Sequence, residues 1–234
     1  MSNPSSALPP APEAFVVLLP ERLIDPAKRA ALTALSDFMA LTRSIASDPT
    51  MPVHLKAANL TALDGTLTTD ENYVPLPKGV RPTVIAPGFT LRRECDTRKI
   101  PVAYGRRIVQ AYKQDATKAR YRDWSELLAY LRFSAGASAA YAVDALGLDK
   151  VLTPKVEALA CAHALIARMT SVGSDFKSGK KIYLPQRWLN DAGLDSEEFS
   201  LDGNGVAWLK VRDLGIVQVR QMLLQSALLL KGNQ

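Results

Sequence analysis

The chain contains few of the residues that build disulfide frameworks and soft metal sites. Its 234 residues include only two cysteines, Cys95 and Cys161, and two histidines, His54 and His163. The cysteines show no motif spacing and the histidines show no metal-ligand spacing. The composition therefore argues against a disulfide-rich secreted domain, and a reducing cytoplasm is the expected compartment.

Long apolar runs are also missing. No stretch reaches the roughly 18 to 20 apolar residues that a membrane-spanning helix needs. The longest candidate, Phe133–Leu148, is rich in alanine and interrupted by Asp144, which favours a buried helix. No segment resembles a cleavable signal peptide. We therefore expect a cytoplasmic protein, with peripheral association with the inner face of the membrane as an alternative.

Positive charge is concentrated in one part of the chain. The formal net charge is +6, and the window from Arg92 to Arg122 accounts for an excess of this size. Clustered cations can bind a diphosphate, anionic lipid or nucleic acid, or can form a solvated face. Nucleic acid is the least favoured partner, because no binding motif is present and aromatic residues are not interleaved. The basic residues of the window are Arg92, Arg93, Arg98, Lys99, Arg106, Arg107, Lys113, Lys118, Arg120 and Arg122, against the acids Glu94, Asp96, Asp115 and Asp123.

Helical periodicity dominates the remaining pattern, so the predicted fold class is all-α. Residues 1–13, rich in Pro, Ser and Ala, are predicted to be a disordered leader, followed by one helical domain over residues 14–234. Asp25-Pro26 is placed to start the first helix and Gly147 to stop a later one. The predicted helices are 27–47, 54–67, 100–113, 124–146, one from Pro154 through Met169, and 211–230, with loops over 70–88 and 191–204.

Three motifs give the most specific signal in the chain. The first is GKKIYLP at Gly179–Pro185, followed by Arg187-Trp188-Leu189. The second starts at Gln114-Asp115 and continues through Arg120-Tyr121, Trp124, Glu126-Leu127-Leu128, Tyr130 and Ala135-Gly136. The third and weaker one is Phe38–Thr50. Together these motifs resemble the squalene/phytoene synthase family, particularly the bacterial hopanoid-pathway squalene synthases, and the resemblance implies a single-domain helical bundle of the isoprenoid synthase type.

The resemblance also implies a magnesium site that this chain lacks in sequence. Active family members ionise a prenyl diphosphate with Mg²⁺ held by two DxxxD motifs, whose acids share a helix face. The first motif aligns with Arg43–Ser47, where Arg43 and Ser47 replace the acids. The second aligns with Ser171–Asp175, where only Asp175 is acidic. We therefore expect no metal ligands, no magnesium cofactor and no catalytic residues. The family's arginine before the first motif and asparagine before the second align with Ala40 and Ala167.

Three functions remain open. The leading hypothesis is a pseudoenzyme that acts through protein–protein binding, with a lipid as a further ligand, by analogy with assembly factors in the same family. The second is a head-to-head prenyltransferase, or a subunit of one, in squalene, carotenoid or hopanoid biosynthesis, acting on farnesyl or geranylgeranyl diphosphate. The third is a peripheral module that binds anionic lipid through the basic window, in which Arg106 and Arg107 would be decisive. The candidate diphosphate-binding residues are Arg43, Arg120, Tyr121, Lys180, Lys181 and Tyr183.

Two further features bear on ligands and partners. The small-residue run Ser134–Ala142 is predicted either to border an isoprenoid cavity or to allow tight helix packing. The end of the chain is predicted to expose an apolar surface, because active relatives continue for more helical residues. A protein partner or a second copy of the chain would cover this surface. Its candidate residues are Leu223, Leu228, Leu229 and Leu230.

Overall fold

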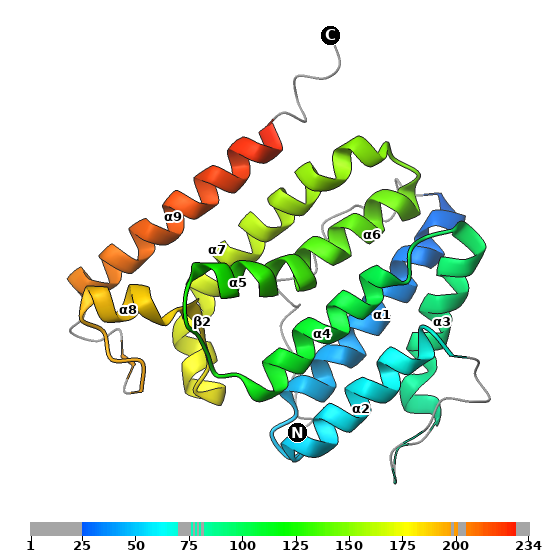
Figure 1. Cartoon of the computed structure of the whole chain (residues 1–234), viewed down its shortest axis with the longest axis horizontal. Helices are drawn as coiled ribbons and strands as arrows, with labels where there is room; N and C mark the ends of the chain where they lie inside the picture. Colours follow the sequence, from blue (N-terminus) through cyan, green and yellow to red (C-terminus); the bar gives the residue numbers. More distant parts are fainter. Residues whose placement is uncertain are drawn as a thin grey trace, which may run out of the picture.

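The protein is described by a computed structural model in which residues 25–69, 76, 78, 80, 82–197, 199–200 and 205–227 are placed. The predicted leader over residues 1–13 and Leu228–Leu230 lie outside the described residues. The described part is almost entirely helical, which confirms the all-α prediction (Figure 1). In chain order the elements are α1 (Pro26–Ser47), α2 (Val53–Thr66), α3 (Pro82–Arg98), α4 (Ala103–Thr117), β1 (Arg120–Tyr121), α5 (Trp124–Leu131), η4 (Arg132–Gly136), α6 (Ala137–Leu146), η5 (Lys150–Leu152), α7 (Thr153–Gly179), β2 (Ile182–Pro185), α8 (Gln186–Ala192) and α9 (Gly205–Ala227).

Helix α1 begins where its capping residues predict. The Asp25 carboxylate accepts a hydrogen bond from the Ala27 amide at 2.8 Å, and Pro26 occupies the first turn. Buried residues such as Leu35 and Phe38 then recur at helical spacing and pack against α3 and α4. The helix ends at Ser47, just before Asp48-Pro49.

The loop prediction over residues 70–88 is wrong at its end, because α3 already begins at Pro82. Proline is tolerated in the first turn of a helix, where its missing N–H has no intrahelical partner. Pro87 lacks one further backbone N–H inside the helix, and α3 packs against α1 and α2. Gly88 allows this close approach, since a Cβ there would lie 2.0 Å from Thr66 Oγ1.

Helices α5, η4 and α6 form one uninterrupted helical segment from Trp124 to Leu146, as predicted. The central turn, η4, is a π-helix, and Gly147 with φ of +67° ends the segment. Every residue of the run Ser134–Ala142 is buried, between α4 on one side and α7 on the other. The run therefore serves close helix packing.

A short parallel strand pair, which the sequence patterns did not predict, joins two of the family-like motifs. Strand β1 pairs with β2 with Arg120 opposite Ile182, and the Ile182 amide donates to the Ala119 carbonyl at 3.0 Å. This pairing holds the loop after α7 against the end of α4. It therefore brings the Arg-Tyr motif beside the Tyr-Leu-Pro motif.

Two hydrophobic clusters build the interior. One combines residues of α1, α2, α3, α4 and α6, and the other combines residues of α5, α7, α8, α9 and β2. Figure 1 shows α1–α4 on one side of the molecule and α9 along the opposite edge, with α5 and α6 between them. Helix α7 extends beyond the prediction to Gly179, and α9 starts six residues before the predicted Val211. None of the described helices combines the length and apolar character that crossing a lipid bilayer requires.

Candidate functional site

A buried carboxylate near the end of α4 is the centre of a polar cluster that α4 and the segment after α7 form together. The Asp115 carboxylate accepts a hydrogen bond from the Tyr183 hydroxyl. It also forms an ion pair with Lys181, whose Nζ lies 3.1 Å from Asp115 Oδ1. Lys181 Nζ also donates to the Asp115 backbone carbonyl. Both partners come from the segment that β1–β2 pairing holds against α4. The cation and the hydroxyl therefore neutralise and satisfy a carboxylate that would be costly to bury alone.

Arg168 of α7 forms the second centre of this polar cluster. Its guanidinium donates to the Tyr130 hydroxyl at 3.1 Å and lies 3.6 Å from the centroid of the Tyr183 ring. A further nitrogen is 3.6 Å from the carboxylate of Asp175, which also accepts a hydrogen bond from the Ser171 hydroxyl at 2.7 Å. The one acid that aligns with a family motif is therefore already engaged by its own helix.

Buried tyrosines surround the two centres. The rings of Tyr121, Tyr130 and Tyr183 lie with centroids 5.3 to 6.0 Å apart, and the Tyr112 ring is buried nearby on α4. Burial raises the pKa of all four phenols, and the Asp115 carboxylate raises each pKa further. The phenols therefore stay protonated at neutral pH, so each hydroxyl has a proton that it can donate.

Two of these phenols have no hydrogen-bond partner among the described residues. The hydroxyls of Tyr112 and Tyr121 are buried and make no hydrogen bond within the part of the chain that the structure describes. A buried polar group without a partner costs about 1–3 kcal/mol. Such groups commonly indicate a bound water, ion or ligand. The polar cluster therefore retains hydrogen-bonding capacity that the described residues do not use.

The motif at the end of α1 has a different character. Arg43 is half-buried and lies near enough to Tyr112 that its positive charge opposes the rise in the pKa of that phenol. The Ser47 hydroxyl is exposed and donates to the Arg43 carbonyl at 2.9 Å. Thr50 donates to the Asp48 carboxylate through its hydroxyl and its amide, and these bonds lower the pKa of that acid. Asp48 thus has the turn role expected of an Asp-Pro pair. A pocket of about 390 Å³ lies beside this end, lined by Leu41, Ser44, Ile45, Ser47, Asp48, Pro49 and Met51.

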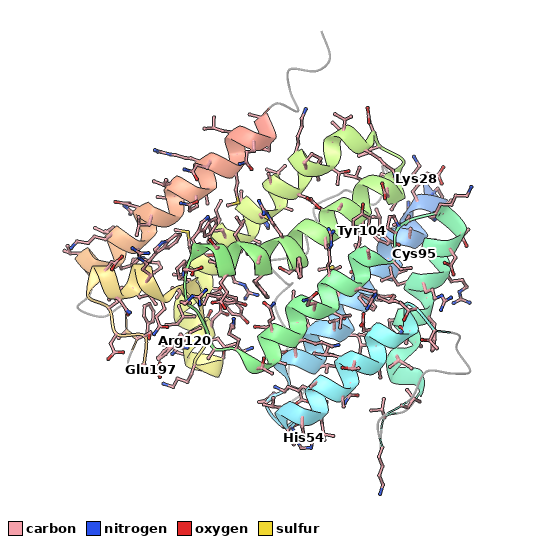
Figure 2. All side chains as sticks on the ribbon, in the orientation of Figure 1. Lys28, His54, Cys95, Tyr104, Arg120 and Glu197 are labelled. Carbon is pink, nitrogen blue, oxygen red and sulfur yellow. The ribbon has the colours of Figure 1, made fainter. Side chains whose placement is uncertain are left out.

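The six predicted diphosphate-binding residues separate into two groups. Lys181, Tyr183 and Tyr121 belong to the Asp115 cluster. Arg43 lies near the cluster, because its charge acts on the Tyr112 phenol and opposes the rise in the pKa of that group. The Arg120 guanidinium instead donates to the backbone carbonyls of Ala119, Lys180 and Ser196, and Figure 2 shows it beside the segment that carries Glu197.

Lys180 is exposed and lies against the Phe176 ring. It has a positive φ of 54° at the end of α7, and its Nζ lies 4.4 Å from the centroid of the Phe176 ring. In the described conformation Arg120 and Lys180 therefore make their contacts with the segments next to the β1–β2 strand pair.

Sequence reasoning missed the residues at the centre. Asp115, Arg168, Tyr112 and Tyr130 were not predicted as site residues, although Asp115 and Tyr130 lie in the second family-like motif. The spacing from Asp115 to Arg120-Tyr121 was the available signal. No sequence signal marked Arg168, which appears as one basic residue in an alanine-rich helix.

The basic window is distributed over α3, α4 and β1, and many of its cations have partners. Arg106 pairs with Asp64 at 3.1 Å, Arg98 with Glu94 at 2.9 Å, and Arg122 with Asp123 at 3.0 Å. Lys118 pairs with Glu126. These pairs reduce the net charge that a lipid surface would meet.

Comparison with known proteins decides the family. The family model described as squalene/phytoene synthase matches residues 18–229. This chain belongs to the squalene/phytoene synthase family. The hydroxysqualene synthase of Sinorhizobium fredii is 25% identical over 210 residues, which cover 90% of this chain and 66% of that protein. The phytoene synthase of Cereibacter sphaeroides is 34% identical over 105 residues, which cover 43% of this chain and 28% of that protein.

A solved structure supports the fold independently. The squalene synthase HpnC from Alicyclobacillus acidocaldarius superposes with a TM-score of 0.61 at 17% identity, over 85% of this chain and 72% of that one. The predicted isoprenoid synthase bundle is therefore confirmed as the fold.

Proposed function

We propose that this chain is a member of the family without magnesium-dependent prenyl transfer, and that it acts by binding, with a protein as its principal partner and a lipid as a further ligand. The supporting observation is the state of the two carboxylates in the polar cluster. Asp115 is paired with Lys181, and Asp175 lies beside Arg168 and accepts from Ser171. Both acids are thus engaged by cations of the chain.

The aligned motif positions lack the concentrated negative charge that a magnesium cluster requires. Mg²⁺ is held by hard oxygen ligands, chiefly carboxylates and substrate phosphates. Among the residues that the structure describes, no group of three or more His, Cys, Asp or Glu side chains is arranged to hold a metal ion. At the aligned positions Arg43 brings a positive charge. The Ser47 hydroxyl donates a hydrogen bond to the Arg43 carbonyl, and the Ser171 hydroxyl donates one to the Asp175 carboxylate. The residues present do not fit the metal that the family implies.

The direct test is titration of the purified protein with farnesyl diphosphate, with and without Mg²⁺, followed by analysis of pyrophosphate and prenyl products. We expect no released pyrophosphate under either condition. Magnesium-dependent release would overturn the proposal and restore the enzyme.

A charge-restoration variant sharpens this test. The triple variant Arg43→Asp, Ser47→Asp and Ser171→Asp installs the missing acids, and the matched control Arg43→Asn, Ser47→Asn and Ser171→Asn changes the same positions without charge. We expect magnesium-dependent binding of pyrophosphate only in the first variant, measured by calorimetry. Equal magnesium-dependent binding by the unmodified chain would show that the missing acids are not the reason for inactivity.

One observation favours a second candidate, metal-independent binding of a diphosphate. The hydroxyls of Tyr112 and Tyr121, which bond to none of the described residues, and the nearby charge of Arg43 offer donors and a cation to an anion. Under this alternative, pyrophosphate and farnesyl diphosphate each bind as tightly in EDTA as in Mg²⁺. Arg43→Ala weakens this binding at least tenfold. Absence of binding in EDTA would exclude it and leave protein binding as the function.

A further inference from the structure

The outer face of α9 carries most of the exposed apolar surface in the described residues. Of eleven large apolar side chains that are exposed there, six lie on this helix. Val206 and Leu224 are the most exposed, at 74% and 72%. Large contiguous exposed apolar surfaces commonly mark interaction sites. The six are Val206, Leu209, Leu214, Val217, Leu223 and Leu224.

The opposite face of α9 is already occupied. Its buried residues, including Val211, Gly215 and Val219, pack against α7. At Gly215 a Cβ would lie 2.5 Å from the Met169 sulfur, so the two helices are in close contact. Figure 1 shows α9 at the edge of the molecule with α7 and α8 on its inner side. A helix that is apolar on both faces is typical of one that is buried on both faces.

The outer face has a regular pattern. Val206, Leu209, Asp213, Val217, Arg220 and Leu224 follow one another at spacings of three or four residues. Side chains at these spacings lie on one side of a helix. All six are exposed. The stripe therefore combines four apolar residues with one acid and one base. Asp213 and Arg220 lie on either side of the middle of α9, at nearly equal distances from it.

This stripe is complementary to itself in the antiparallel orientation. With a two-fold axis between Ile216 and Val217, Leu209 of one copy faces Leu224 of the other, and Asp213 faces Arg220. Each of these contacts occurs twice, as a two-fold interface requires. A parallel pair would instead place Asp213 against Asp213 and Arg220 against Arg220. Opposite charges favour the first arrangement, and like charges oppose the second.

The existing partner of Asp213 does not prevent this contact. Asp213 pairs with the adjacent Arg212 at 2.8 Å, and both side chains are exposed. Exposed pairs of this kind contribute little to stability. The Asp213 carboxylate therefore remains accessible to a second guanidinium.

We propose that two copies of this chain associate through the outer faces of α9, packed antiparallel about a two-fold axis. The inference deepens the proposed function, on which it rests for the expectation that the chain acts by binding protein, and it names a second copy as the partner. Dimerisation is measured without prenyl diphosphate or magnesium. A chain that proves to be monomeric would therefore contradict the dimer proposal without contradicting the proposed loss of prenyl transfer.

The test is the mass of the full chain in solution by analytical ultracentrifugation over a concentration series. We expect a species of twice the 25.5 kDa chain mass. Asp213→Arg places arginine against arginine and is expected to raise the dimer dissociation constant about tenfold or more. Adding Arg220→Asp to the same chain restores the opposite charges and is expected to restore the dimer.

Two further variants separate the interface from general effects. Val217→Asp places two carboxylates near the two-fold axis and is expected to give a monomer with an unchanged circular dichroism spectrum. Asp191→Arg, which changes an exposed acid on α8, is the matched control and should leave the dimer intact. A monomeric unmodified chain would overturn the proposal. So would a dimer that survives Asp213→Arg and Val217→Asp, or a double variant that is not rescued.

Discussion

At the end of α1 the serine that aligns with the first acidic motif faces solvent and its own backbone, whereas at the end of α7 the aligned side chains belong to a network built around the buried Arg168. Ser47 is exposed and donates to a carbonyl one turn earlier. Ser171 donates to Asp175, which also lies beside the buried Arg168. Arg168 in turn contacts Tyr130 and Tyr183.

The difference shows how the cost of burial governs the replacement of a polar site. An exposed acid can be replaced by a serine at little cost, because water satisfies the new side chain. A buried acid is tied to its donors, so its loss would leave their hydrogen bonds unmade. We therefore expect the α7 side of the site to contribute much more to stability than the α1 side.

The largest effect is expected at Asp115, to which Lys181 and Tyr183 from the segment after α7 are bound. Asp115→Ala leaves the buried Tyr183 phenol without its acceptor and leaves the partly buried Lys181 ammonium with only the backbone carbonyl of residue 115, and we expect a loss of about 3 kcal/mol in the free energy of unfolding. Urea denaturation measures this loss. The exposed Asp37→Ala is the control and should change stability by less than about 0.5 kcal/mol. Equal effects of both variants would contradict the proposed contribution of the cluster.

A matched pair of arginines tests the contrast between the two helices. Arg168→Met removes a hydrogen bond to Tyr130 and the contact with the Tyr183 ring, and is expected to cost about 2 kcal/mol. Arg43→Met on α1 keeps the aliphatic volume of a half-buried side chain and is expected to cost less than about 1 kcal/mol. Thermal and urea denaturation of both variants would show the order. A larger loss at Arg43 would reverse the comparison.

The smallest effect is expected at the two serines. Ser171→Ala removes the 2.7 Å hydrogen bond to Asp175 and should cost about 1 kcal/mol. Ser47→Ala replaces a side chain that bonds only to its own helix, and alanine is the better helix former, so stability should stay within about 0.5 kcal/mol. Chemical denaturation at neutral pH resolves this difference. A loss at Ser47 as large as that at Ser171 would show that the first motif is not a solvated helix end.

The sequence predicted what depends on local pattern. Asp25 and Gly147 mark helix ends because capping and positive φ have strong residue preferences. The start of α3 at Pro82 was missed, because tertiary packing outweighed the signal of two prolines. The exposure of Leu223 agrees with the prediction of an apolar surface near the chain end.

The polar cluster was only half predicted, because its members are far apart in the chain. Lys181 and Tyr183 were found through their motif. Their acceptor Asp115 lies on another helix, and the pairing depends on strands of two and four residues that no periodicity reveals. Arg168 was missed because its role follows from the tyrosines around it.

The β1–β2 pair also determines when the site can form during folding. Lys181 lies 66 positions after Asp115 in the chain, and the segment between them includes all of α5, η4, α6 and α7. Closing such a loop has an entropic cost that local helix contacts do not have, and non-local contacts generally slow folding. We expect the helices to form on the microsecond scale of helix formation and the strand pair to close later. The polar cluster would then assemble as one of the last events on the folding pathway.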